Sequence, residues 1–529
     1  MKPSCILTVL LATVTLSPRT AHAQDPEIAV SDVGQLRAAI AAAGPGDEIV
    51  LADGEYVIDR TFDCTAPGRA DAPVVVRAAN PLGAVVRSSA IVAFHAQAPH
   101  WAFQGLDIQG TCADHSQCEH AFHITGHADG TVVRSCRMRD WNAQIKGNGD
   151  FVGEGGVIVF PDDVLIEGNE MYSEAPRDTG NPVTPVDIVG GRRWIVRANY
   201  IHDHAKLGAD QVSFAAFFKG NSRDGLMERN LVVCEQLHSG QIRLGLSFGG
   251  GGTQPDRFCE DGTCSPEHQG GVMRNNIIVR CPTDVGIYLN EATNAQVDHN
   301  TLFDTAGIDV RFQASTVALR NNLLDGRIRT RDGGTMDTAG NVEQVGVQAL
   351  QAWFRDPGAA DFTLLDGAAF VDQGVGAAGV ANDYCGVARD DGAPDAGAVE
   401  YRAGAACDTT RPPLEAAAPG EVPDELPGEG EGEVQGGADE GAGEGEGEGV
   451  GQGEADEGGD EGAGDGGDDG DGQEGEGEVV DPGANGEAGQ GPGALDDGPR
   501  GGGSRRDDGG LCASAPGAGG GRRLLFPRR

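Results

Sequence analysis

Hydrophobic and polar positions alternate in short segments along this chain, and the segments repeat. Residues 211–219 and 241–249 each open with Gln, alternate apolar positions and carry a Phe before a turn. Between them lies the phrase LMERNLVV, residues 226–233, with related phrases elsewhere: VVRSCRM, LIEGNEM, IVRANYI, VMRNNII, VDHNTL and VALRNNL. Internal repetition at a short period is typical of stacked solenoids.

A recurrent Asn marks the repeat in most of these phrases. The markers are Asn169, Asn199, Asn230, Asn276, Asn300 and Asn322, which lie 30, 31, 46, 24 and 22 residues apart. The shortest intervals cannot hold a βαβ unit, and short strands with Gly and Asn turns at this period predict coils of a parallel β-solenoid around a shared interior. We expect the repeated Asn side chains to stack and to hydrogen-bond along the axis.

The first part of the repeat region predicts a cap. Residues 31–44 form the pattern of a capped amphipathic helix that ends at Gly44, and strands are expected within 46–58 and 72–79. A helix over the first coil would cover strand edges that otherwise invite pairing with other chains.

The opening AIAAAGPGDEIVLADGEY at 39–56, with APVVVRAA at 72–79 and WAFQGLDI at 101–108, resembles the start of secreted right-handed parallel β-helix proteins. It is most similar to the chondroitinase B and alginate lyase group of polysaccharide lyases. The resemblance covers roughly residues 30–400, and residues 354–357 and 395–400 are similar to the way such domains end. It implies an all-β fold, a single-stranded right-handed parallel β-helix with an N-terminal capping helix.

Composition divides the chain into four parts. Residues 1–23 have an apolar core and the small-residue site Ala21-His-Ala23, which predict a secretory signal peptide too short to span a membrane. Residues 24–407 are the predicted β-helix domain, 408–500 a disordered Gly/Glu/Asp-rich linker, and 501–529 a basic tail. We therefore expect a protein that is secreted or held at the cell surface.

The acidic linker carries much of the negative charge. Of 82 acidic residues, 28 lie between Arg411 and Arg500, so the net charge of −43 does not imply an acidic surface on the folded domain. The last residues resemble in outline the C-terminal sorting tails of myxobacterial surface proteins but lack their apolar span, which leaves anchoring and simple secretion both open. We expect a monomer that binds no nucleic acid, because no basic patch carries interleaved aromatic residues.

The predicted domain contains ten cysteines, an even number that suits an oxidising compartment. A zinc site is the alternative, but the chain has no C-x-x-C pair. The local pairs that the spacing favours are Cys112 with Cys118, Cys259 with Cys264, and Cys385 with Cys407.

Cleaving a uronate polymer by β-elimination needs a base for the C5 proton, an acid or cation at the leaving oxygen, and positive charge near the carboxylate. Lys219 and Arg243 belong to successive predicted coils, one strand position apart in register, and are expected to project into one groove. In the resembled lyases a Lys on one coil is the base, an Arg on the next is the acid, and calcium holds the uronate. The resemblance thus implies Lys219 as base and Arg243 as acid.

The chain departs from that pattern around the predicted base. Val212 and Phe214 stand where the group has two Glu ligands for calcium, and Gly220 follows Lys219 where Ser is usual. Asp187 and Asp210, on nearby predicted strands, are the carboxylates that we expect to hold Ca²⁺ instead.

One coil is longer than its neighbour by about 22 residues, a polar, Gly-rich insertion at 249–270. Long loops on rigid scaffolds often carry binding groups, so we expect this loop, stapled by Cys259 and Cys264, to wall a groove. The further substrate-binding candidates are His238, Gln241, Asp309 and Arg311. Asp309 and Arg311 alternate on one outer face, where they either extend the groove or pair with each other.

Two His-rich segments offer other chemistry. His202-Asp203-His204 is either a metal or acid–base site or, more commonly, a charged turn that faces solvent. The cluster His115, His120, His123 and His127 matches no fixed metal-ligand spacing.

The sequence leaves three candidate functions. The favoured one is a lyase that cleaves an acidic polysaccharide. A β-helix glycoside hydrolase is the enzymatic alternative, although no doubled Asp motif marks a coil centre. A non-catalytic carbohydrate-binding or adhesive module is the third.

Overall fold

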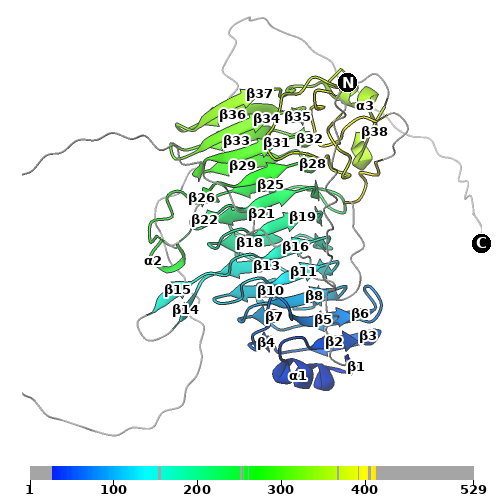
Figure 1. Ribbon diagram of the computed structural model, residues 1–529, viewed down its shortest axis with the longest axis vertical. Helices are drawn as coiled ribbons and strands as arrows, with labels where there is room; N and C mark the ends of the chain where they lie inside the picture. The colour runs from blue at the N-terminus through cyan, green and yellow to red at the C-terminus, as the bar shows by residue number, and fades with distance from the viewer. Residues whose placement is uncertain are drawn as a thin grey trace, which may run out of the picture. The chain divides into compact units, whose positions relative to one another are not determined.

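The computed structural model describes residues 27–412 except for 153–155, 251, 252, 254, 260, 366–368, 391 and 403–406. The predicted signal peptide, most of the linker and the basic tail lie outside the described residues. The described chain winds through three long parallel sheets, which we call A, B and C. Along the chain, strands follow one another in the order C, A, B in each coil (Figure 1). The predicted parallel β-helix is confirmed.

The strands of the three sheets are short and follow one another coil by coil. Sheet A consists of β1 (Ile28–Val30), β2 (Glu48–Leu51), β5 (Val74–Ala78), β8 (Trp101–Gln104), β11 (Val132–Arg134), β16 (Leu165–Glu167), β19 (Ile195–Arg197), β23 (Leu226–Glu228), β27 (Val272–Arg274), β31 (Ala295–Asp298), β34 (Thr316–Arg320) and β37 (Thr335–Ala339). Sheet B consists of β3 (Gly54–Ile58), β6 (Ala84–Ser88), β9 (Asp107–Gly110), β12 (Arg137–Arg139), β17 (Glu170–Tyr172), β20 (Tyr200–His202), β24 (Leu231–Val233), β28 (Ile277–Cys281), β32 (Thr301–Thr305) and β35 (Leu323–Leu324). Sheet C consists of β4 (Phe62–Cys64), β7 (Val92–Ala96), β10 (His120–Thr125), β13 (Ala143–Asn148), β18 (Val186–Val189), β21 (Val212–Lys219), β25 (Ile242–Phe248), β29 (Ile287–Asn290), β33 (Gly307–Arg311) and β36 (Arg327–Arg331).

The repeated phrase of the sequence encodes the corner between sheets A and B. In LMERNLVV, strand β23 is followed by Arg229 with φ 56°, then by Asn230, and then by β24. A single residue in the left-handed region turns the chain sharply, and the same conformation precedes the marker in the other coils. The equivalent residues with positive φ are Ser135, Gly168, Ala198, Asn275, His299, Asn321 and Gly340.

Buried Asn side chains form the predicted ladder at this corner. The Asn199 amide nitrogen Nδ2 donates to Oδ1 of Asn230 at 3.1 Å and to the carbonyl of Ile166 at 2.8 Å. Its own Oδ1 accepts from the backbone N–H and the side chain of Asn169, each at 3.0 Å. The rungs are Asn169, Asn199, Asn230, Asn276, Asn300, Asn322 and Asn341. The ladder therefore satisfies backbone and side-chain groups inside the solenoid.

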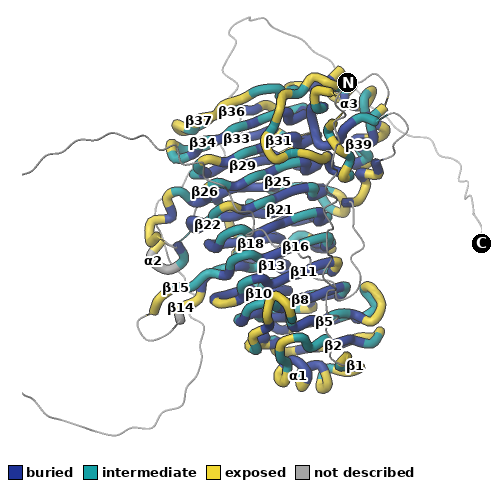
Figure 2. Tube along the Cα trace, viewed as in Figure 1, coloured by how far each residue is buried: buried dark blue, intermediate teal, exposed yellow. Residues whose placement is uncertain are grey.

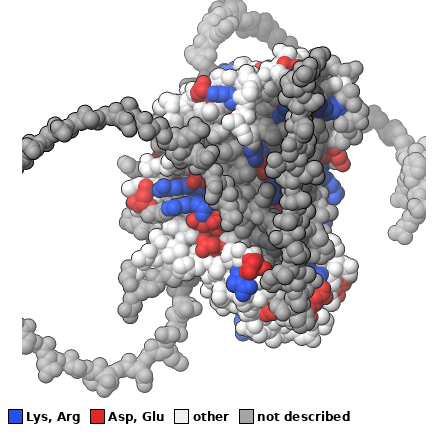
Figure 3. Space-filling model, viewed as in Figure 1, with Lys and Arg blue, Asp and Glu red and all other residues white. Residues whose placement is uncertain are grey.

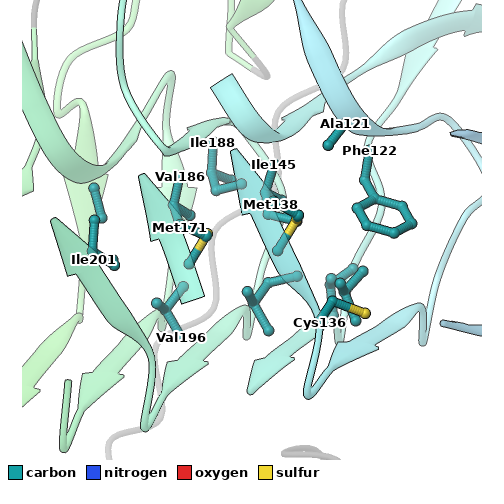
Figure 4. Close-up of a cluster of buried hydrophobic side chains, with 14 of the residues drawn as sticks. Ala121, Phe122, Cys136, Met138, Ile145, Met171, Val186, Ile188, Val196 and Ile201 are labelled. Carbon is teal, nitrogen blue, oxygen red and sulfur yellow. The ribbon is translucent and has the colours of Figure 1, made fainter. Parts of the chain in front are cut away.

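Apolar side chains from all three sheets fill the interior. Figure 4 shows Met138, Ile145, Met171, Val186 and Ile201, from strands of successive coils, packed into the same space. At the N-terminal end the rings of Phe62, Phe94 and Phe122 stack with centroids 5.2 and 5.4 Å apart. Burial follows the strands, and exposed residues gather at turns and on α1 (Figure 2). Stacked coils thus bury a core that one coil could not bury alone.

The first coil is covered by α1 (Val33–Ala42), which confirms the predicted cap. Asp32 caps this helix by accepting from the backbone N–H of Gln35, and Leu36, Ala39 and Ile40 face the core. None of the helices in the described part of the chain has the length and apolarity that crossing a bilayer requires.

The segment after the last coil packs on the outside of sheet B. It contains α3 (Val347–Trp353), β38 (Phe354–Asp356) and β39 (Asp361–Leu364). Its Phe354, Phe362 and Tyr384 are buried with Val279 and Phe303, which lie on the outer face of β28 and β32. This part of sheet B is therefore closed to ligands.

The outer face of sheet A carries alternating charges along the axis. Register places these residues in one row: Arg134, Glu167, Arg197, Glu228, Arg274, Asp298 and Arg320. Glu167 lies 3.3 Å from Arg134 and 2.7 Å from Arg197, and Arg274 lies 2.7 Å from Glu228. On the face that Figure 3 shows, groups of blue and red side chains lie beside one another.

Four disulfides link the described cysteines. The three predicted pairs are confirmed: Cys112–Cys118, Cys259–Cys264 and Cys385–Cys407. A fourth, Cys234–Cys281, joins two successive coils across 47 residues, and Cys64 and Cys136 are free and buried. Four disulfides fit a protein of an oxidising, extracellular compartment.

Replacing one ladder residue tests the ladder. We expect Asn199→Ala to lower the free energy of unfolding by about 2–4 kcal/mol, because it leaves buried groups of Asn169 and Ile166 without partners. Chemical denaturation followed by circular dichroism measures the change. Asn382→Ala, at an exposed position, is the control, and equal effects of the two substitutions would contradict a ladder that stabilises the fold.

Candidate functional site

Parallel register arranges the outward side chains of sheet C in rows along the axis. One row contains Asp63, His95, His123, Lys146, Asp187, Phe217, Ser247, Tyr288, Asp309 and Arg329. A second row, two residues further along each strand, contains Thr125, Asn148, Val189 and Lys219, and continues further up the sheet with Asn290, Arg311 and Arg331. We call this surface the sheet C face. It combines imidazole, ammonium, carboxylate, aromatic and guanidinium groups.

Lys219 ends β21 in the middle of this face. Its ammonium lies 4.6 Å from the centre of the Phe217 ring, and Gly220, with φ 69°, turns the chain directly after it. Burial lowers the pKa of Lys219, and the positive charge of Lys146 lowers it further, while Asp187 and Glu267 act in the opposite direction. A lysine with a lowered pKa is a better candidate for a base than an exposed one.

Lys146 and Asp187 form an ion pair. They lie on β13 and β18, the two strands that precede β21 in sheet C. The Lys146 ammonium lies 2.8 Å from Oδ1 of Asp187, and the side chains are 20% and 7% exposed. Our sequence reading missed Lys146, although the tripeptide Lys-Gly-Asn occurs both at 146–148 and at 219–221. In register, however, Lys219 corresponds to Asn148 and not to Lys146, so this repeat does not place the two lysines at equivalent positions.

Three histidines continue the face beyond Lys146. The His95 and His123 rings stack with centroids 4.8 Å apart, and His120 lies 5.0 Å from His123. Burial lowers the pKa of all three, that of His120 to about 3, so they are neutral at pH 7. His123 bonds Asn148 at 2.7 Å and His95 bonds Thr125 at 2.9 Å, which leaves their rings firmly oriented.

Apolar and aromatic side chains occupy the face next to Lys219. Phe214 contacts Phe217 edge-on at 5.5 Å and lies 6.5 Å from Tyr288. Tyr288 belongs with Leu244 and Val285 to a cluster outside the main core, and Phe214 packs against this cluster. Aromatic faces beside polar groups are suited to contact with sugar rings.

The long insertion folds against the turn that follows β21. The side chain of Asn221 donates to the carbonyl of Pro266 at 2.7 Å and accepts from the backbone N–H of Asp261 at 3.2 Å. Glu267, at the end of the insertion, accepts the Gly220 N–H at 2.7 Å, and burial raises the pKa of Glu267. Four residues of this insertion, 251, 252, 254 and 260, lie outside the described part.

The predicted pairing of Lys219 with Arg243 is wrong. Arg243 pairs with Ser213, six residues before Lys219, so the two positions are about 20 Å apart along the strand direction. Ala215 and Ala216 both face the core, which reverses the in–out alternation, and Arg243 is fully buried. Its guanidinium donates to the carbonyls of Gly240 and Cys234 and to the His238 ring.

His238 and Gln241 lie with Arg243 and not with Lys219. The His238 ring accepts from Arg243 at 2.9 Å and donates to the carbonyl of Ser173 at 3.1 Å. Gln241 directly precedes β25 with φ 60°. His238 and Arg243 hold the loop before β25 in place.

The segment His202-Asp203-His204 is buried and does not face solvent. Asp203 bonds His202 at 2.7 Å and accepts the backbone N–H groups of residues 236, 237 and 238. The Nε2 of His204 donates to the carbonyl of Leu244 at 3.0 Å. The segment therefore anchors the same loop.

The predicted calcium ligands do not come together. Asp187 pairs with Phe217 in register, whereas Asp210 precedes Phe217 by seven residues, about 20 Å along an extended strand. Asp187 bonds Lys146, and Asp210 lies 2.5 Å from Lys206. No group of three His, Cys, Asp or Glu suited to a metal occurs among the described residues. The donor set at the sheet C face does not fit calcium.

Asp309 and Arg311 lie on the sheet C face, but they do not bond each other. Asp309 is buried between Arg329 and Arg331, and Arg311 bonds Asp332 and the Tyr288 hydroxyl. Both residues are on β33, three strands beyond β21 in the sheet.

Removing the charge of Asp187 tests the electrostatics around Lys219. Because this carboxylate raises the pKa of Lys219, we expect Asp187→Asn to lower that pKa further. The chain has four lysines, so NMR titration of ¹³C-methylated lysines resolves the change. Asp332→Asn, at the far end of the face, is the control, and an unchanged or higher Lys219 pKa in Asp187→Asn would contradict the arrangement.

Solved structures of similar shape include several polysaccharide-degrading enzymes. The match to pectate lyase Pel9A has 14% identity and a TM-score of 0.47, and covers 69% of this chain and 90% of that one. The match to an alginate lyase from Paenibacillus sp. str. FPU-7 has 16% identity and a TM-score of 0.34, covering 60% and 95%. A rhamnogalacturonan lyase matches at 14% identity with a TM-score of 0.38, covering 59% and 85%.

No protein-family model matches the chain, and no curated protein sequence matches it significantly. At identities this low, the likeness to the solved structures is a likeness of fold.

Proposed function

We propose that the sheet C face binds an acidic, uronate-containing polysaccharide and that Lys219 starts its cleavage by β-elimination. The observation that carries this proposal is the lowered pKa of Lys219 on a face that also holds aromatic and cationic groups. The disulfides, which fit an extracellular protein, agree with a polymeric substrate outside the cell.

The base must remove a proton from carbon C5 of the uronate. Burial disfavours the ammonium form of Lys219, so a larger share of this side chain is the neutral amine at a given pH than for an exposed lysine. As the C5–H bond breaks, a C4–C5 double bond forms and the C4–O bond breaks. The proton that Lys219 has taken can then pass to the departing oxygen.

Positive charge near the substrate carboxylate makes the C5 proton easier to remove. Lys146 lies two strands from β21, within electrostatic reach of Lys219, and its ammonium is oriented by Asp187. Phe214, Phe217 and Tyr288 offer apolar surface for the sugar rings beside these charges. With Arg243 enclosed elsewhere, Lys146 is our candidate for the group that neutralises the carboxylate.

Two substitutions of one residue separate catalysis from binding. We expect Lys219→Ala to reduce the formation of unsaturated uronate ends from alginate, polygalacturonate or chondroitin by at least about 100-fold, the usual contribution of a general base. Ultraviolet absorbance of the unsaturated product measures the rate. Lys219→Arg keeps a cation but not a base, so it should lose activity and still bind the polymer. A Lys219→Ala variant with full activity would overturn the assignment.

The pH dependence gives a further readout in the same assay. The amine must be unprotonated to act, so the rate should rise with pH through the pKa of Lys219, which lies below the ordinary lysine value. Reducing ends without unsaturated product would indicate a hydrolase, and retention of the polymer without any product a binding module.

A further inference from the structure

The C-terminal end of the sheet C face contains a cluster of arginines that the proposed chemistry does not use. Arg311 lies on β33, and Arg329 and Arg331 lie on β36, all on the outer face. Their side chains are 14%, 40% and 26% exposed. We call this group, together with Tyr288, the distal arginine cluster.

Fixed partners orient each guanidinium. The buried Asp309 bonds Arg329 through both of its oxygens and Arg331 at 2.8 Å. Arg311 bonds Asp332 and donates to the Tyr288 hydroxyl at 3.1 Å. Three guanidinium groups with five N–H donors each face the carboxylates of Asp309 and Asp332, with the Asp284 carboxyl group nearby, so N–H donors remain for an anion.

A buried acceptor lies within the same cluster. Asp284 is 7% exposed, and its Oδ2 has no hydrogen-bond partner among the described residues. Burial raises its pKa, while Arg329 and Arg331 oppose that shift. A carboxyl group beside oriented guanidinium groups is suited to a ligand with both hydroxyl and carboxylate groups.

The cluster lies in line with Lys219. The strands β21, β25, β29 and β33 are consecutive in sheet C, so Arg311 is three steps, about 14 Å, from Lys219 along the axis. In the neighbouring row, Phe217 lies on the same strand as Lys219, and Tyr288 lies two strands further toward Arg311. A chain with a charged group on successive sugars can therefore contact Lys219, the aromatic strip formed by Phe214, Phe217 and Tyr288, and the arginines at once.

We propose that the distal arginine cluster is a second anion-binding subsite that holds a polyuronate chain several sugars away from Lys219, and thereby favours long chains over short oligomers. This inference rests on the proposed substrate class but not on catalysis. A stretch of chain between the two subsites contacts the aromatic strip, and the two charged ends fix its direction along the axis.

The test compares two matched arginines on different faces. Arg311 and Arg320 lie on consecutive strands β33 and β34, are 14% and 21% exposed, and each pairs with an exposed Asp, Asp332 or Asp337. Arg320 belongs to sheet A. We expect Arg311→Gln to weaken retention of the full chain by polygalacturonate or alginate in affinity gels about tenfold, because a charge-assisted contact is lost. Arg320→Gln should leave retention unchanged.

Short ligands complete the test. Calorimetry with galacturonate and mannuronate disaccharides should give equal affinities for wild type and Arg311→Gln, because a disaccharide that binds at Lys219 is shorter than the roughly 14 Å to Arg311. Arg331→Gln, which leaves Arg329 on Asp309, serves as the second variant if Arg311→Gln does not fold by circular dichroism. Retention that is equal in Arg311→Gln, Arg331→Gln and Arg320→Gln overturns the subsite, as does equal weakening by Arg311→Gln of disaccharide and polymer binding.

The two proposals fail in different ways. A wild-type protein that retains polyuronate without cleaving it refutes the catalytic proposal, and the Arg311 comparison still decides the subsite. If no polyuronate gel retains the wild-type protein, or if immobilised single-stranded DNA retains it as strongly, the proposal of a polyuronate subsite is overturned.

Discussion

The alignment of successive coils depends on the hydrogen bonds of the buried Asn ladder. Each rung joins an amide to the amide and backbone of the next coil, at a corner that a single left-handed residue creates. Because these groups are buried, a coil shifted by one residue would leave several of them without partners. From Asn169 to Asn341 the ladder therefore favours one register between coils, and register decides which side chains share a row.

The three outer faces of the solenoid meet different physical conditions. On sheet A, alternating arginines and acidic residues neutralise one another from coil to coil. The later strands of sheet B are covered by the C-terminal segment, whose aromatic side chains bury them. Sheet C has its charged and aromatic groups in rows between loops. A long ligand that follows the axis meets the greatest chemical variety on this face.

Lys219 shows how fold and chemistry are connected. The same register that places it over Phe217 also places Asp187 and Lys146 on the two preceding strands. Partial burial lowers its pKa, and the insertion at 249–270 folds against the adjoining turn. Arg243, Asp203 and His238 lie toward the opposite end of the strands, where β25 begins, and fix the loop that leads into β25.

The sequence by itself determined how each coil is built from strands and turns. The repeated phrase contains the strand of sheet A, the turn residue, the buried Asn and the strand of sheet B, so the fold, the ladder and the capping helix were predictable from local pattern. Disulfides between cysteines 6, 5 and 22 residues apart were predictable for the same reason, whereas Cys234–Cys281 spans an inserted loop.

Only the tertiary structure decided which side chains meet. Coil lengths differ, so Lys146, Asp187 and Lys219 become neighbours although their separations in sequence follow no rule. Two consecutive alanines facing the core reverse the alternation within β21, which strict periodicity could not anticipate, and Arg243 is consequently buried. Local pattern specifies how one coil is built, whereas the contacts between coils depend on the packing of each strand against the next.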